Sequence, residues 1–227
     1  GRGTFYCTEM VGRRVVEMSP DGDVVGVLAE TYDGRPLDNP NDMTLDAKGG
    51  AYFTDSSFLA GHELYQTACV YYVSADGTIT RVIDDISFPN GLELTPGGQT
   101  LIVVNTMGGS DKGRSIYAFD VNADGTVTNK RVFGELEMAP EEMAKEDGAS
   151  GADGTAMDIE GNLYVATTKG LGIQVFNRDG EHLGNIPCPS VCNNITFGGP
   201  DMKTMFVSAL DGVYSLPVKI AGLKQPQ

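Results

Sequence analysis

The chain has 227 residues, of which 41% are hydrophobic, and a formal net charge of −15. Its length fits one large domain, and its acidity disfavours nucleic acid or an anionic membrane surface as a partner. No apolar run approaches the ~20 residues that a membrane-spanning helix needs.

Short strand-like runs separated by glycine-rich turns recur along the chain. The second strand of each repeat contains one apolar or aromatic residue at an equivalent position, and these are Phe5, Tyr52, Ile102, Tyr164 and Phe206. Repeats of about 40 to 50 residues with several short strands each are typical of β-propeller blades. We therefore expect an all-β propeller that occupies residues 1–221 as one domain.

Asp-Gly pairs provide a second periodic signal. They are Asp21-Gly22, Asp76-Gly77, Asp124-Gly125 and Asp179-Gly180. Asp-Gly between strand-like runs is a strong hairpin signal. Each repeat is thus predicted to contain an inner and an outer pair of strands.

One repeat is longer than the others because of an insertion at residues 135–150. Pro140 followed by acidic residues predicts a short helix or ordered loop, and an acidic surface loop is the alternative. Residues 222–227 are expected to form a frayed C-terminal tail.

The four cysteines are Cys7, Cys69, Cys188 and Cys192. Without a second Cys or His pair at zinc spacing, we expect free, mostly buried thiols, with a disulfide as the alternative. No secretory leader is visible, but the chain begins at Gly1. A cytoplasmic, periplasmic or secreted location therefore stays open.

In each later repeat, a small polar residue stands 11 or 12 residues before the marker residue of the second strand. These residues are Asn41, Asn90, Asp153 and Asn194. Inner strands of a propeller begin near its central channel, so the four side chains are expected to converge there. Amide and carboxylate oxygens suit a hard cation such as Ca²⁺. Spacing alone leaves a second interpretation open, in which these residues only cap turns.

The segments around these residues resemble a known family. Asn39-Pro40-Asn41-Asp42, the run 88–92 and the run 152–158 are similar to marker segments of the gluconolactonase / senescence-marker-protein / luciferin-regenerating-enzyme family. The run 197–204 resembles a further family segment. The resemblance extends from about Gly3 to Val218.

The resemblance implies a six-bladed propeller of four-stranded blades with one divalent ion in the channel. Ca²⁺ is the expected ion, with Zn²⁺, Mg²⁺ and Mn²⁺ as alternatives. By this analogy Asn90 and Asp153 are metal ligands, Asn41 lies at the ion, and Asp153 is also the general base. Asn41, Asn39, Asn194 and His62, the last in a loop that could overhang the channel mouth, are candidate substrate-binding residues.

Two departures from the family pattern matter. The family's first ligand, a Glu in an early Glu-Gly-Pro segment, has no counterpart here. We therefore expect that the chain either lacks about one N-terminal blade or belongs to a truncated relative. Asn39 stands where some sugar-lactone hydrolases have Arg, which leaves the preference for aldonolactones open.

The resulting prediction is a metal-dependent hydrolase that opens a small, aldonolactone-like lactone to its hydroxy acid. The ion would polarise the carbonyl, and Asp153 would assist water attack. The expected partner is the small-molecule lactone, and the expected state is a monomer or weak homo-oligomer. The alternatives are a phosphotriesterase-like hydrolase on the same site and a non-catalytic propeller binding module.

Overall fold

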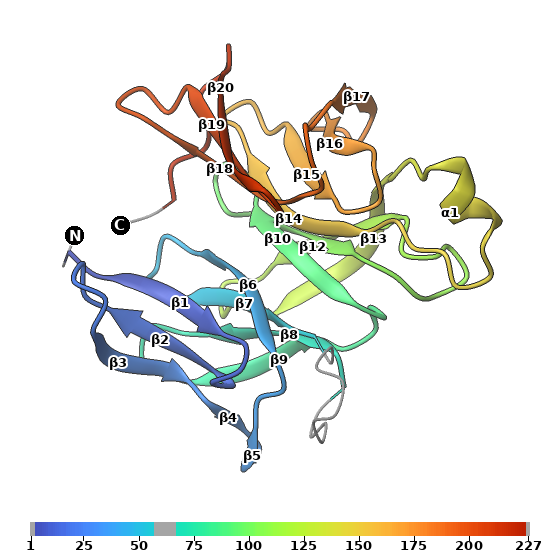
Figure 1. The fold of residues 1–227 in the computed structure, drawn as a ribbon. Helices are drawn as coiled ribbons and strands as arrows, with labels where there is room; N and C mark the ends of the chain where they lie inside the picture. Colours follow the sequence, from blue (N-terminus) through green and yellow to red (C-terminus); the bar gives the residue numbers. More distant parts are fainter. Residues whose placement is uncertain (1–2, 57–66, 226–227) are drawn as a thin grey trace.

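The computed structural model describes residues 3–56 and 67–225. Five sheets of three or four strands are arranged as blades around a common centre, which makes the chain an all-β propeller (Figure 1). A small hairpin of β4 (Thr31–Tyr32) and β5 (Arg35–Pro36) stands between the first two blades in chain order.

The three middle blades have four antiparallel strands each, joined in chain order. The second blade contains β6 (Pro40–Leu45), β7 (Ala51–Asp55), β8 (Cys69–Val73) and β9 (Ile79–Ile83). The third contains β10 (Pro89–Leu94), β11 (Thr100–Asn105), β12 (Ser115–Val121) and β13 (Val127–Glu135). The fourth contains β14 (Ala152–Met157), β15 (Leu163–Thr167), β16 (Gly172–Phe176) and β17 (His182–Ile186). The predicted inner and outer strand pairs are confirmed in these blades.

The first and last blades have three described strands each. The first is formed by β1 (Phe5–Glu9), β2 (Arg14–Met18) and β3 (Val24–Ala29). The last is formed by β18 (Cys192–Gly198), β19 (Thr204–Ala209) and β20 (Gly212–Pro217). Five blades are described, so the sixth blade expected from the family resemblance stays a prediction.

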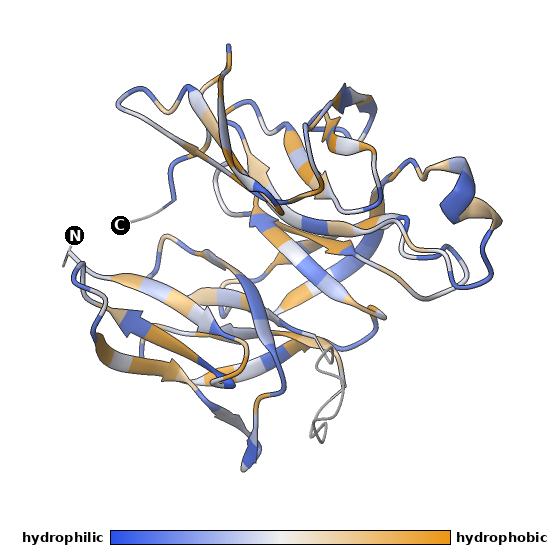
Figure 2. Cartoon of the chain, in the orientation of Figure 1, coloured by the Kyte–Doolittle hydropathy of each residue, from blue (hydrophilic) through white to orange (hydrophobic). Residues whose placement is uncertain are grey.

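The hydrophobic core consists of layers between neighbouring blades. Alternating residues of one strand serve two layers, because successive side chains point to opposite faces of a sheet. In β7, Tyr52 packs towards the third blade, whereas Phe53 packs towards the first. Apolar residues therefore follow one another in the middle strands, as in residues 101–104 of β11, which are all buried, and Figure 2 shows orange segments along the blades. The Tyr52 hydroxyl also donates to the Gly125 carbonyl at 2.8 Å, which ties the second blade to the third.

The four Asp-Gly hairpins are confirmed, and in each loop the glycine has positive φ, for example 87° at Gly77 and 85° at Gly125. The preceding aspartates are not among the positive-φ residues. The loops therefore place only their glycine in the left-handed region, as in hairpin loops that end in a glycine bulge.

The insertion contains the short helix α1 (Pro140–Ala144), which confirms the helical interpretation. Pro140 stands at its first turn, followed by Glu141 and Glu142, as helix N-termini favour. Across residues 3–56 and 67–225, no helix has the length and apolarity that crossing a bilayer requires.

The expectation of a frayed tail is wrong as far as Gln225. The Leu223 amide donates to the Met157 carbonyl at 2.8 Å, and Gly222 forms a bridge with Asp158. Close packing requires glycine at position 222, because a Cβ there would overlap the Phe197 side chain. The tail therefore packs against the inner strands instead of extending into solvent.

Candidate functional site

The inner strands β6, β10, β14 and β18 follow one another around the centre of the molecule, each in contact with the next (Figure 1). We call the end at which these strands begin the hub. Near its start, each inner strand has an irregularity in its pairing with the second strand of its blade. In β6, β10 and β14 these irregularities contain Asn41, Asn90 and Asp153. Such bulges turn a side chain away from the regular pleat, and they are frequent beside active sites.

The structure brings these three side chains together. The Asn41 amide donates from Nδ2 to Asn90 Oδ1 at 2.8 Å. Asn90 in turn donates from Nδ2 to Thr106 Oγ1 at 3.0 Å, and its amide lies close enough to the Asp153 carboxyl to lower the pKa of that group. The three predicted ligands thus form one connected series across three blades.

Thr106 fixes two of these residues, and the sequence gives no specific signal for it. Its hydroxyl accepts the bond from Asn90 and donates to the Ala152 carbonyl at 2.6 Å, directly before Asp153. Ser56 has a similar role one blade earlier, since its hydroxyl donates to the Pro89 carbonyl, directly before Asn90. These hydroxyl groups link neighbouring blades at the hub.

The hub has acidic groups without basic partners. Burial raises the pKa of Asp153 to about 6, although the hydrogen bond from Asn90 acts in the opposite direction. Burial also raises the pKa of Asp42 to about 7, and the nearby Asp153 charge adds to this increase. In the described part of the chain, neither carboxyl forms an ion pair. Two partly buried acids without a cationic partner form a site at which a bound metal cation would stabilise their ionised state.

Asn39 is 1% exposed, and its side-chain amide donates to the Asp38 carbonyl. Its backbone N–H donates to Asp55, which also accepts the N–H of Asp38 at 3.0 Å. Asp55 therefore holds the segment that leads into Asn41. Burial raises the pKa of Asp55 to about 6, while these two N–H groups oppose the increase.

Asn194 is exposed and lies against Gly154, where a Cβ would overlap its side chain. Its Oδ1 accepts the backbone N–H of Ile195 at 2.7 Å. His62 lies outside the described residues, so its predicted substrate contact stays a prediction.

Further along the channel lies Glu93, a buried acid that the sequence analysis missed. It is 9% exposed and accepts a hydrogen bond from Gln225 Nε2 at 3.1 Å. The Thr44 hydroxyl lies 3.5 Å from Glu93 Oε2 and 3.3 Å from Gln225 Oε1. The tail residue Gln225 thus connects β6 and β10 beside a cavity of about 330 Å³. Glu93 is three residues beyond Asn90, and this spacing was the available signal.

Glu93 leads to a prediction about stability and pH. Burial, and then the Asp42 charge, raises the pKa of Glu93 from 4.5 to about 8. An acid whose pKa is higher in the folded state contributes full stability below pH 4.5 and loses it as the pH rises towards 8. Glu93→Gln cannot ionise and should not lose stability in this way. The melting temperature of the variant minus that of wild type should therefore be higher at pH 9 than at pH 5, by on the order of a few °C. Thermal melts of both proteins with chelator present would measure the difference, and a constant offset at all pH values would contradict the prediction.

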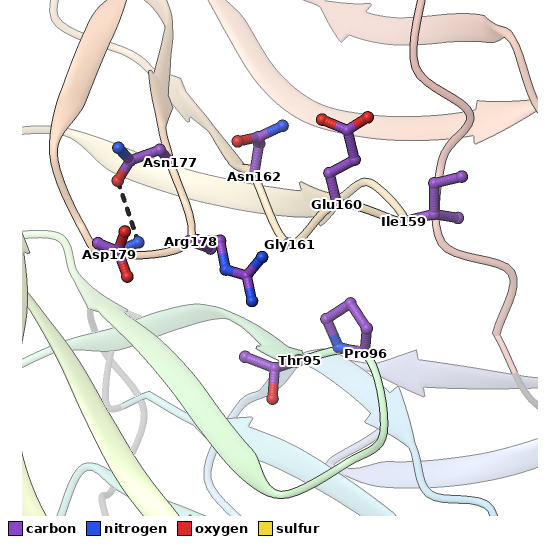
Figure 3. Close-up of a pocket in the computed structure, with 9 residues that line it drawn as sticks. All are labelled: Thr95, Pro96, Ile159, Glu160, Gly161, Asn162, Asn177, Arg178 and Asp179. Carbon is purple, nitrogen blue, oxygen red and sulfur yellow. Dashed lines mark hydrogen bonds between the residues drawn. The ribbon is translucent and has the colours of Figure 1, made fainter.

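A larger cavity, about 640 Å³, lies elsewhere (Figure 3). It is lined by turn residues that include Thr95, Glu160 and Arg178. Thr95 follows the last residue of β10, whereas Asn90 stands at the start of that strand. This cavity is therefore at the opposite end of the strands from the hub and does not contain the predicted ligands.

The donor set at the hub suits a hard cation. Asn41 and Asn90 carry amide oxygens and Asp153 a carboxylate, all oxygen donors of the kind that Ca²⁺ accepts. Within residues 3–56 and 67–225, no group of three or more His, Cys, Asp or Glu side chains is placed to hold a metal. The candidate site therefore depends on amides together with one acid.

The described cysteines are all free thiols. Cys69 and Cys192 are buried, whereas Cys7 and Cys188 are partly exposed. The prediction of free thiols is confirmed, and that of burial holds for two of the four.

The fold and the site define a β-propeller with a cluster of amide and carboxyl side chains at its hub. The chain belongs to the SMP-30/gluconolactonase/LRE-like family, whose model matches residues 1–211. The family resemblance seen in the marker segments is thus confirmed.

Individual relatives agree with this assignment. The chain is 27% identical over 228 residues to a gluconolactonase from Zymomonas mobilis, covering 97% of this chain and 62% of the relative. It is 33% identical over 175 residues to lactonase drp35 from Staphylococcus aureus, covering 72% of this chain and 49% of the relative. The chain therefore spans less than two thirds of the length of these two relatives.

A solved structure has the same fold. The gluconolactonase from Xanthomonas campestris matches with a TM-score of 0.78 at 30% identity, covering 95% of this chain and 69% of that chain.

Proposed function

We propose that this chain carries the active site of a metal-dependent lactone hydrolase with an aldonolactone-like substrate. The observation that carries the proposal is the cluster of Asn41, Asn90 and Asp153 at the hub, in which Asn41 donates to Asn90 and Asn90 lowers the pKa of Asp153. The family assignment also supports the proposal, because relatives of this chain are named gluconolactonase and lactonase.

In this proposal Asn90 and Asp153 hold one divalent cation, Ca²⁺, and Asn41 lies beside it. The bound cation would supply polarisation of the lactone carbonyl. Zn²⁺, Mg²⁺ and Mn²⁺ are the alternatives, and metal-dependence tests with each ion separate them.

Asp153 accepts a proton from the attacking water. Burial raises the pKa of Asp153 to about 6 in the metal-free protein, and a bound cation would act in the opposite direction, so the group would be ionised and able to accept a proton at neutral pH. The water oxygen bonds to the acyl carbon, the ring C–O bond breaks, and the ring oxygen takes up a proton. Lactone and water thus become one hydroxy acid. The Asn41 amide, which donates to Asn90, would orient the substrate.

The test is an assay of acid release from glucono-1,5-lactone, corrected for spontaneous hydrolysis, before and after chelation and after adding back CaCl₂. We expect hydrolysis that chelation abolishes and calcium restores. Lactone hydrolysis that persists unchanged in metal-free protein would contradict the mechanism. An aryl phosphotriester assayed in parallel separates the phosphotriesterase-like alternative, which predicts faster turnover of that ester. A binding module predicts no turnover of either compound.

A further inference from the structure

The strand register identifies which residue of the last blade corresponds to Asn41, Asn90 and Asp153. In β6, β10 and β14 the irregular segment begins after one inner-strand residue, and regular pairing resumes three residues later. The bounding pairs are Pro40–Asp55 and Met43–Phe53, Pro89–Asn105 and Leu92–Val103, and Ala152–Thr167 and Thr155–Val165. In the last blade the irregularity lies between the pairs Cys192–Ala209 and Asn194–Ser208, and Ile195–Val207 follows, so β18 again advances three residues while β19 advances two. The residue that follows the first pair is Asn193, so Asn193 occupies the position of the three predicted ligands.

A local contact gives the same alignment independently. Asp42 Oδ1 accepts the N–H of the next residue, Met43, at 2.8 Å. Asn194 Oδ1 accepts the N–H of its own next residue, Ile195, at 2.7 Å. Asn194 therefore corresponds to Asp42, and Asn193 corresponds to Asn41.

The side chain of Asn193 also has an unsatisfied oxygen. Its Oδ1 is buried and has no hydrogen-bond partner among the described residues. A buried acceptor without a partner costs about 1–3 kcal/mol, a cost that a ligand could remove. The neighbouring blade contributes Asp153 at the same position, and an ionised carboxylate has no proton to donate. A cation bound between these two residues would satisfy both oxygens.

We propose that Asn193 Oδ1 is a further oxygen ligand of the hub cation, beside Asn90 and Asp153. The inference rests on the proposed function, in which these two residues hold the ion. A hard cation such as Ca²⁺ accepts six to eight oxygens, so the set has room for another donor.

A matched pair of charge substitutions tests the assignment. Asn193→Asp and Asn194→Asp add one negative charge at adjacent residues, so their long-range attraction for a cation is similar. Only Asn193→Asp places the charged oxygen at the ligand position. In calorimetric titrations of metal-free protein with CaCl₂, Asn193→Asp should bind about tenfold more tightly than Asn194→Asp, because ligand charge strengthens Ca²⁺ binding. Equal affinities, or tighter binding by Asn194→Asp, would overturn the proposal.

Removal of the donor gives the converse result. Asn193→Ala should bind Ca²⁺ about tenfold more weakly than wild type, and unchanged binding would overturn the proposal. Asn185→Ala, on the outer strand β17 with surface hydrogen bonds to His182 and Glu137, is the control and should bind as wild type does. If Asn193→Ala fails to fold by circular dichroism, the comparison of the two aspartate variants decides.

The wild-type titration separates the assignment of Asn193 from the proposed function. Wild type that binds Ca²⁺ and hydrolyses lactone, together with Asn193 variants that bind as wild type does, overturns only the assignment of Asn193. Wild type that binds no Ca²⁺ overturns the proposed function and this inference with it.

Discussion

Replacement of Asp153 by asparagine is expected to lower lactone hydrolysis by about 10²- to 10⁴-fold, the range in which positioned acids and bases contribute. The variant loses both the proton acceptor and the negative charge at the hub. It should nevertheless fold, because asparagine has nearly the same shape and burial already disfavours the Asp153 charge. Initial rates at saturating CaCl₂, with a melting curve of the same sample, measure both effects.

Stability separates this interpretation from a purely structural role for Asp153. In metal-free protein Asp153→Asn should melt at the wild-type temperature or above it, and added CaCl₂ should raise the melting temperature of wild type only. A variant that is inactive because it unfolds, or one that retains wild-type activity, would be inconsistent with the proposed role. Glu181→Gln, in a surface hairpin with hydrogen bonds to Asn177, is a matched loss of one acid that should change neither property.

Gly91→Ala is expected to damage stability and cation binding together. A Cβ at Gly91 would overlap the Asp153 carbonyl oxygen and would lie 2.7 Å from Thr155 Cγ2. Because a backbone atom cannot move out of the way cheaply, β10 and β14 must separate where they carry Asn90 and Asp153. Overpacking of this kind costs about 1–3 kcal/mol of unfolding free energy. We expect Ca²⁺ affinity to fall at least about tenfold as the ligands move apart.

Gly212→Ala is the control for this substitution. Gly212 has no atom within 4 Å of the position of an added Cβ, and it is not among the residues with positive φ. Denaturant unfolding and calcium titration should give wild-type values for Gly212→Ala and reduced values for Gly91→Ala. If the two variants behave alike, close packing between β10 and β14 does not hold the ligands in place.

The repeat pattern of the sequence predicted the blades because each blade repeats the same turn chemistry. The Asp-Gly hairpins and the second strands that contain Tyr52, Ile102 and Tyr164 lie where the pattern placed them. The convergence of Asn41, Asn90 and Asp153 could be predicted because inner strands of successive blades begin at one end of the channel.

Counting back from the second strand selected Asn194 in the last blade, whereas the register aligns Asn193 with the predicted ligands. Thr44 pairs with Tyr52 in the second blade, but Thr196 pairs with Phe206, so the last inner turn is longer by two residues. Spacing along the sequence counts turn residues and strand residues alike. Only strand pairing separates the two.

Contacts between distant segments could not be predicted from local patterns. Glu93 and Gln225 are joined by a hydrogen bond across 132 positions, and the tail was expected to fray. The Thr106 hydroxyl donates a hydrogen bond to the Ala152 carbonyl, 46 residues further along the chain. Such pairs depend on how the blades pack, which no short segment encodes.

The proposed mechanism depends on one cation that Asn90 and Asp153 bind together. The most direct measurement is a crystal structure of the protein with Mn²⁺, whose anomalous scattering locates the ion independently of the refined coordinates. We predict one strong anomalous peak at the hub in contact with Asn90 Oδ1 and the Asp153 carboxylate. A hub without such a peak at saturating Mn²⁺, or a peak that contacts neither residue, would contradict the account.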